Sequence, residues 1–145
     1  MSGHTGAGAA GAAGAAGGTG GTGGTGGTIR VRGVRGATRV ERDDPTMIRA
    51  ATREMLTALL ERNAVSAAQV VSAVFTVTPD LTSEFPARAA RELGWTETAM
   101  LCSVEIPVRG AMERVVRVLV HLELPGNAEV RHVYLNGAEE LRPDL

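Results

Sequence analysis

The sequence predicts an α+β fold of the α/β type: a mixed β-sheet with two main helices packed on it. Five segments carry the β-branched or alternating apolar pattern that is typical of strands, at 28–34, 70–78, 98–107, 114–124 and 129–135. Two further segments, near 45–63 and 86–93, carry apolar residues at helical spacing. The resulting order, β-α-β-α-β-β-β, indicates a compact domain with a mixed sheet.

The chain divides into two parts by composition. Residues 1–28 contain only Gly, Ala, Thr, Ser, one His and the initiator Met, in Ala-Ala-Gly and Gly-Gly-Thr repeats. Such a segment has almost no apolar surface to offset its backbone entropy, so we expect a disordered tail. Residues 29–145 remain, and they are long enough for one domain with a modest core.

Both helices have local start and stop signals. Asp44 can cap the first helix, Pro45 fits its first turn, and the apolar spacing ends near Asn63. Pro86 begins the second helix and Gly94 stops it. The segment between the second strand and this helix, "TPDLTSEF", is expected to be a loop.

The segment "RVVRVLVHLEL" is predicted to be a strand with two unlike faces. One face is apolar throughout and consists of Val116, Val118, Val120, Leu122 and Leu124. The other face carries Arg117, Leu119, His121 and Glu123. An arginine in mid-strand is either solvated on a one-sided sheet or, if a second subunit covers that face, partly desolvated and in need of an anion.

Arginine supplies all of the cationic charge of this chain. There are 15 positive residues, none of them lysine, and the formal net charge is −1. The absence of lysine excludes a P-loop lysine, a Schiff-base lysine and a pyridoxal phosphate anchor. The near-neutral charge argues against nucleic acid as the main partner, whereas planar guanidinium forks suit carboxylates and phosphates.

The composition also bounds the compartment and the kind of site. Cys102 is the single cysteine, so no intrachain disulfide can form and a reducing, cytoplasmic compartment is expected. No window approaches the roughly 18 consecutive apolar residues of a membrane span. The spacing of His121 and His132 suggests no metal site, and no zinc pattern occurs in the sequence.

The first predicted strand is unusually rich in arginine. Within "IRVRGVRGATRV" the arginines are Arg30, Arg32, Arg35 and Arg39. Either this segment is a solvated edge or something acidic binds there. Gly33 and Gly36 faintly resemble a phosphate-cradling loop, but the full glycine fingerprint and its βαβ context are missing.

Cys102 and Glu105 lie three residues apart on one predicted strand. Strict alternation puts them on opposite faces, so they serve one ligand only if the strand twists or ends there. Without a ligand, Cys102 is expected to be a small buried apolar residue. Spacing also leaves a nucleophilic Cys102–His132 pair open, with nothing in its favour.

Five pieces of the chain, in this order and spacing, resemble the chorismate mutases of the trimeric α/β-barrel class, which are unrelated in fold to the all-helical chorismate mutases. The pieces are "RGVRGATRVERD", "TPDLTSEFPARAARELGW", "CSVE", "RVVRV" and "RHVYLNGAEELRPDL". The resemblance covers essentially all of 29–145. It implies a homotrimeric pseudo-α/β-barrel that rearranges chorismate, a dicarboxylate, to prephenate in aromatic amino-acid biosynthesis. It also implies no cofactor and no covalent intermediate.

The resemblance assigns the central site residues. Arg35 corresponds to the arginine that binds a substrate carboxylate, and Tyr134 to a tyrosine that contacts a carboxylate. Arg117 corresponds to the catalytic arginine beside the ether oxygen of the breaking bond. Glu105 and Cys102 correspond to the pair that engages the ring hydroxyl.

The remaining assignments come from two peripheral segments. The loop and helix start that a neighbouring subunit supplies to the cleft correspond to Phe85, Ala87, Arg88 and Arg91. The C-terminal segment that closes over it corresponds to Leu141 and Arg142. Arg88 departs from the family, which often has lysine there.

Two other classes of protein stay open at this point. One is a different trimeric small-molecule enzyme of similar architecture, such as a reactive-intermediate deaminase, which also binds a carboxylate by arginine in an intersubunit cleft. The "CSVE" and "LRPDL" pieces do not belong to that pattern. The other is a non-catalytic interaction domain that keeps only the fold.

Overall fold

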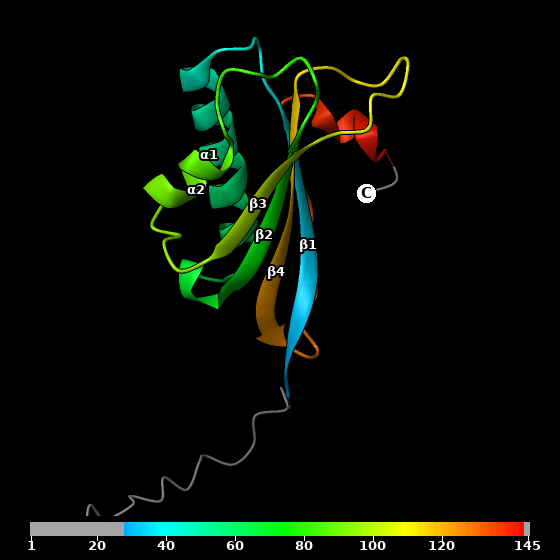
Figure 1. The fold of residues 1–145 in the computed structure, drawn as a ribbon. Helices are drawn as coiled ribbons and strands as arrows, with labels where there is room; N and C mark the ends of the chain where they lie inside the picture. Colours follow the sequence, from blue (N-terminus) through cyan, green and yellow to red (C-terminus); the bar gives the residue numbers. More distant parts are fainter. Residues whose placement is uncertain (1–27, 144–145) are drawn as a thin grey trace, which may run out of the picture.

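The computed structural model describes residues 28–143, so the expected tail at 1–28 lies, apart from Thr28, outside the described residues. The elements in chain order are β1 (Ile29–Arg39), α1 (Pro45–Arg62), the 3-10 helix η1 (Ala67–Gln69), β2 (Val70–Val77), α2 (Ala87–Glu92), β3 (Ala99–Val104), β4 (Val115–Pro125), β5 (Val133–Leu135) and the 3-10 helix η2 (Ala138–Leu141) (Figure 1). The predicted order of strands and helices is confirmed.

The five strands form one mixed sheet in the order β3-β2-β4-β1-β5. The central strand β4 runs antiparallel to both of its neighbours, β1 and β2. The outer strands β3 and β5 run parallel to β2 and β1. Segments far apart in sequence thereby become neighbours: Arg117 of β4 lies between Ala37 of β1 and Thr76 of β2.

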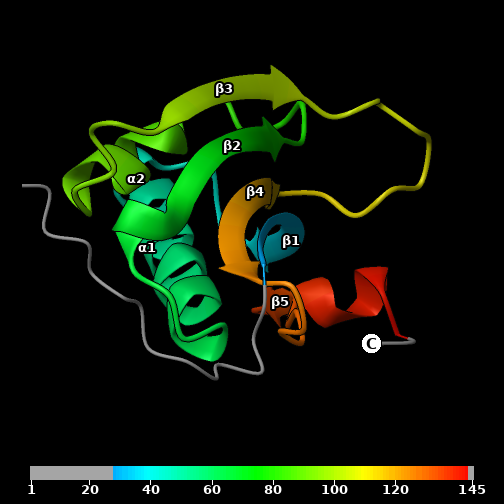
Figure 2. The same ribbon diagram turned by 90° about the horizontal axis from the view of Figure 1, so that it is seen from below.

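Both α-helices lie on the same face of the curved sheet (Figure 2). The five apolar residues predicted for one face of β4 are at most 3% exposed, and they share one core cluster with the apolar face of α1. Complete burial of one such side chain contributes about 1.5–3 kcal/mol, so this layer holds the domain together. The predicted alternation along β4 is confirmed.

The start and end of α1 follow the local signals in the sequence. Asp44 has extended backbone angles, and its side chain accepts a hydrogen bond from the Met47 N–H at 3.0 Å. Pro45 occupies the first helical position, where a backbone N–H would lack an intrahelical partner. At the other end, the Asn63 side-chain amide donates to the Leu59 carbonyl at 2.8 Å. Among the helices of residues 28–143, none is long and apolar enough to cross a bilayer.

The first strand is longer than predicted. It continues through both of its glycines to Arg39 instead of ending at Val34, so Gly33 and Gly36 belong to a strand and form no phosphate-binding loop. Gly36 has a packing role, because a Cβ there would lie 3.0 Å from Val118 Cγ1 and 3.2 Å from Met55 Cγ. Glycine therefore allows β1 and α1 to approach closely.

The last strand is shorter than predicted. β5 begins at Val133, whereas the sequence pattern began at Glu129. The reason is that the Arg131 backbone bonds to a side chain: its N–H donates to Asn63 Oδ1 at 2.9 Å, and its carbonyl accepts from Asn63 Nδ2 at 2.9 Å. The C-terminal end of α1 thus holds the Arg131 backbone out of the sheet.

Neither α-helix covers the opposite face of the sheet. In Figure 2 the segment that follows β3 and the η2 region border this face on two sides. Beside it, the β3 edge and the segment beyond expose apolar side chains: Leu101 is 71%, Val104 62%, Ile106 79% and Val108 64% exposed. The helix-free face and this edge are where the chain offers surface for a ligand or another protein.

Candidate active site

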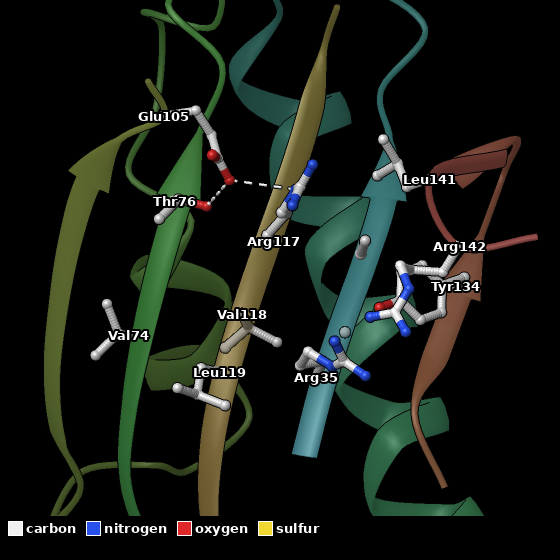
Figure 3. Close-up of a pocket in the computed structure, with 12 residues that line it drawn as sticks. Arg35, Val74, Thr76, Glu105, Arg117, Val118, Leu119, Tyr134, Leu141 and Arg142 are labelled. Atoms are coloured by element: carbon white, nitrogen blue, oxygen red, sulfur yellow. Dashed lines mark hydrogen bonds and ion pairs between the residues drawn. The ribbon is translucent and has the colours of Figure 1, made fainter. Parts of the chain in front are cut away.

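A cavity of about 410 Å³ opens on the helix-free face of the sheet, a size that suits a small ligand (Figure 3). Its walls come from β1, β2, β4, β5 and the C-terminal segment. Six of the predicted site residues line it: Arg35, Glu105, Arg117, Tyr134, Leu141 and Arg142. Folding therefore brings six of the eleven predicted site residues into one place.

Glu105 and Arg117 form an ion pair at one end of the cavity. β3 ends just before Glu105, whose backbone N–H donates to the Val77 carbonyl at 2.8 Å. Its Oε1 lies 3.2 Å from Arg117 Nε and accepts from Thr76 Oγ1 at 2.6 Å (Figure 3). The contacts with Arg117 and Thr76 both end on Oε1, an arrangement that orients both charged groups before any ligand arrives.

Arg35, Tyr134 and Arg142 lie at the other end of the cavity (Figure 3). They come from β1, from β5 and from the residue after η2. The Asn136-Gly137 turn, with φ of 54° and 92°, redirects the chain from β5 into η2. This turn returns the C-terminal segment to the cavity.

The charge of the cavity selects its ligand. Three guanidinium groups and one carboxylate line it, so the lining carries more positive than negative charge. Apolar side chains of β2 and β4, Val74, Val118 and Leu119, complete the wall. A small dianion with an apolar body matches this combination of charge and surface.

The other predicted site residues form a second group near the β3 edge. Phe85, which is 68% exposed, and Cys102 line a separate cavity of about 390 Å³. Arg88 pairs with Glu84 at 3.4 Å, Arg91 is exposed on α2, and Ala87 is buried in the main core at 4% exposure. Within one chain, these residues do not line the cavity that holds Arg35 and Arg117.

Cys102 differs from its sequence-based expectation. Its register partner on β2 is the core residue Phe75, which puts Cys102 toward the helix side of the sheet, away from Glu105. Cys102 and Glu105 therefore lie on opposite faces of the sheet, as strict alternation predicts. The expected burial of Cys102 is wrong, because β3 is an edge strand and leaves the thiol exposed. A Cys102–His132 pair is also ruled out within one chain, since β3 and β5 are opposite edges of the sheet.

The loop that carries Phe85 is held by Asp43. The Asp43 carboxylate accepts hydrogen bonds from the Thr82 and Ser83 backbone N–H groups, both at 3.1 Å. It also accepts from their hydroxyls, at 3.0 Å and 2.7 Å. The Ser83 hydroxyl is the largest cause that lowers the pKa of Asp43 below its usual value. The start of α1 thus fixes the loop that presents Phe85.

The sequence did not reveal the contacts of two polar residues of this region. Thr76 orients Glu105, as described above, and His132 accepts a hydrogen bond from the Arg35 backbone N–H at 3.0 Å. Neither carries a local sequence signal, because strand register alone creates both contacts. Within residues 28–143 no group of three or more His, Cys, Asp and Glu side chains could hold a metal ion.

Fold and cavity together define an α+β small-molecule enzyme whose cationic cleft takes a compact acidic ligand. The family model for chorismate mutase type I matches residues 31–145. The chain is 50% identical over 117 residues to chorismate mutase AroH of Thermus thermophilus, covering 79% of this chain and 95% of that protein. It is 41% identical over 117 residues to chorismate mutase AroH of Bacillus subtilis strain 168, covering 79% and 91%.

A solved structure gives the same result for the fold. The chorismate mutase from Clostridium thermocellum matches with a TM-score of 0.71 at 40% identity, over 75% of this chain and 98% of that one. The chain belongs to the chorismate mutase type I family, and it is an isomerase with chorismate mutase activity. The resemblance drawn from the sequence is confirmed, and the deaminase-like and non-catalytic alternatives are set aside.

Proposed function

We propose that this enzyme rearranges chorismate to prephenate in a cleft completed by a neighbouring subunit of a homotrimer. The observation that carries the proposal is the cavity with three arginines, Arg35, Arg117 and Arg142, on the helix-free face of the sheet. Chorismate is a dicarboxylate, and its negative charge suits a lining that holds more guanidinium groups than carboxylates. The downstream role is phenylalanine and tyrosine biosynthesis in the cytoplasm.

Substrate binding falls to the end of the cavity that holds Arg35. The Arg35 guanidinium binds one substrate carboxylate, and Tyr134 and Arg142 contact the carboxylates from β5 and the C-terminal segment. Leu141 closes the cavity beside them. Anchoring both carboxylates holds the flexible substrate in its compact reactive conformer, which removes part of the entropic barrier.

Arg117 carries the catalytic step. The rearrangement is a concerted redistribution of electrons in which a C–O ether bond breaks as a C–C bond forms within one molecule. Negative charge develops on the ether oxygen, and a guanidinium fixed there binds the transition state better than the substrate. Glu105 and Thr76 pre-orient that guanidinium, because Glu105 Oε1 contacts both groups.

Glu105 has a second role toward the ring hydroxyl of the substrate. Its Oε1 is engaged by Arg117 and Thr76, so we assign Oε2 as the acceptor for the hydroxyl. Positioning and charge stabilisation together need to supply roughly 8 kcal/mol for a rate gain of about 10⁶. The proposed reaction requires neither a nucleophile nor a general base, and no cofactor or metal enters it.

A neighbouring subunit supplies the second group of site residues. Phe85 and Cys102 lie at the β3 edge of the chain, next to the exposed apolar surface of Leu101 and Val104. Docking this edge against the helix-free face of another copy buries both surfaces and brings the two groups together. Arg88, Arg91 and the backbone at Ala87 then enter the cleft from that subunit, and Cys102 joins Glu105 at the hydroxyl.

One experiment tests the activity and a second tests the assembly. Purified protein incubated with chorismate should consume it, which is followed as loss of the substrate's ultraviolet absorbance with prephenate as the product. Sedimentation equilibrium should give a trimer under the assay conditions. An active stable monomer would contradict the intersubunit cleft while leaving the activity in place.

A further inference from the structure

His132 makes an unusual contact with the backbone of the first strand. It directly precedes β5, and its Nδ1 accepts a hydrogen bond from the Arg35 backbone N–H at 3.0 Å. The pairing of β1 with β5 begins one residue later on each strand, at Gly36 and Val133. The imidazole therefore takes the place of a strand carbonyl where the ladder has not yet begun.

This contact lies directly behind the substrate-binding end of the cavity. Arg35 presents its side chain to the cavity from the same residue whose N–H the imidazole holds. Two residues after His132, Tyr134 lines the same cavity. The hydrogen bond thus fixes β1 and β5 relative to each other at the point where both contribute a group that meets a substrate carboxylate.

We propose that His132 is a positioning residue that holds Arg35 in its substrate-binding place only while its ring is neutral. The inference rests on the proposed role of Arg35 as a carboxylate anchor. An accepting Nδ1 requires the tautomer that carries its proton on Nε2. Protonation of Nδ1 places two N–H donors opposite each other, since the Arg35 N–H lies 3.0 Å away. The hydrogen bond between Arg35 and His132 then breaks, and the start of β5 moves away from β1.

The charges around the ring favour its neutral form. Arg35 acts on it from β1 and Arg142 acts on it from the segment after η2. Its chain neighbour Arg131 is exposed and pairs with Glu129 at 3.8 Å. Partial burial of the ring, followed by the charges of Arg35 and Arg142, lowers the pKa of His132 below its ordinary value of 6.5. Because the pKa is lowered in the folded state, the stability contributed by the neutral ring is fully present above pH 6.5 and is lost as pH falls from there through the lowered pKa.

Two variants separate the hydrogen bond from the charge. In His132→Asn the amide oxygen can take the place of Nδ1 as an acceptor that does not titrate. In His132→Ala the acceptor is lost at every pH. The matched control is His121→Asn, because His121 bonds to Ser72 Oγ at 3.0 Å and does not line the cavity. Each variant is checked for unchanged assembly by sedimentation before its kinetics are compared.

The experiment measures kcat and KM for chorismate between pH 5 and pH 8.5. At pH 8, His132→Ala should raise KM roughly three- to tenfold with little change in kcat, the size expected for one lost hydrogen bond at an anchoring group. Wild type and His121→Asn should lose kcat/KM below pH 6.5 through a rise in KM. His132→Asn should lack that acid limb.

Three outcomes would overturn the inference. The first is an acid limb of the same size in His132→Asn, and the second is an unchanged KM in His132→Ala. The third is a wild-type KM that falls toward acid pH, because this would mean that the added positive charge attracts the substrate and that the hydrogen bond does not matter. An acid limb caused by any group other than His132 would persist in His132→Asn and is thereby distinguished. Arg35→Ala is measured alongside. If Arg35→Ala leaves KM unchanged, the proposed anchoring role of Arg35 fails. If Arg35→Ala raises KM but wild type and His132→Asn have identical pH profiles, only the role of His132 is refuted.

Discussion

Replacing Arg117 with alanine tests the mechanism most directly. In one chain the Arg117 side chain, on the central strand β4, is 48% exposed and pairs with Glu105 at 3.2 Å. Such a half-exposed ion pair contributes only about 0–1 kcal/mol to folding. The free energy of unfolding should therefore change little, and a large loss of activity would come from substrate binding or the chemical step and not from unfolding.

The expected kinetic effect is far larger. Loss of one preorganised donor to a developing negative charge typically costs roughly 2.7–4 kcal/mol, or about 10²–10³ in rate. Arg117 is a full cation, and bound substrate excludes water from the cleft, so its loss should cost at least the upper value of this range. Arg117→Ala should therefore lower kcat by at least about 10³. Arg117→Lys should recover only part of this, because an ammonium keeps the charge but loses the planar fork.

The assay follows chorismate absorbance for wild type, Arg117→Ala, Arg117→Lys and a control. Arg53→Ala is the matched control, because Arg53 is 51% exposed and pairs with Glu92 at 2.6 Å, on helix α1 away from the cavity. It removes a comparable exposed ion pair and should leave kcat unchanged. If Arg117→Ala raised KM and left kcat intact, Arg117 would be a ground-state anchor and the catalytic assignment would be wrong.

Four further predictions follow from the same structure. Glu105→Gln should lower kcat/KM about tenfold and Glu105→Ala should lower it more, because each weakens a charged hydrogen bond to the ring hydroxyl. Unchanged steady-state kinetics in Glu105→Ala would remove Glu105 from the site. Leu101→Asp should weaken trimer assembly in sedimentation and lower activity with it, because it buries a charge in the proposed interface, whereas an intact trimer would place the interface elsewhere. Gly36→Ala should lower the melting temperature, since its Cβ meets Val118 Cγ1 at 3.0 Å, and Gly33→Ala, whose Cβ lies 3.5 Å from Leu119 Cδ1, should do so less. Deleting residues 2–27 should leave melting temperature and turnover nearly unchanged, because that segment has little apolar surface to bury; loss of trimer assembly would contradict this.

Local signals in the sequence determined most of the secondary structure. The Asp44-Pro45 start of α1 and the alternation along β4 depend on residues within a few positions of each other, so they can be predicted from spacing alone. The resemblance to a known family gave the activity and the residues proposed for the site. It did so because five motifs occur in register, although no single motif explains what its residues contact.

The tertiary structure alone decided which side chains meet. Glu105 lies beside Arg117 and Thr76 because β3, β2 and β4 are neighbours in the sheet, and Arg35 meets His132 across 97 residues of chain. Local patterns also misjudged β1, β5 and the exposure of Cys102, since strand length and burial depend on which strand lies alongside and which strand is the edge. Contacts of this kind are fixed by strand pairing between distant segments. The apolar alternation within one segment does not indicate which other segment will pair with it.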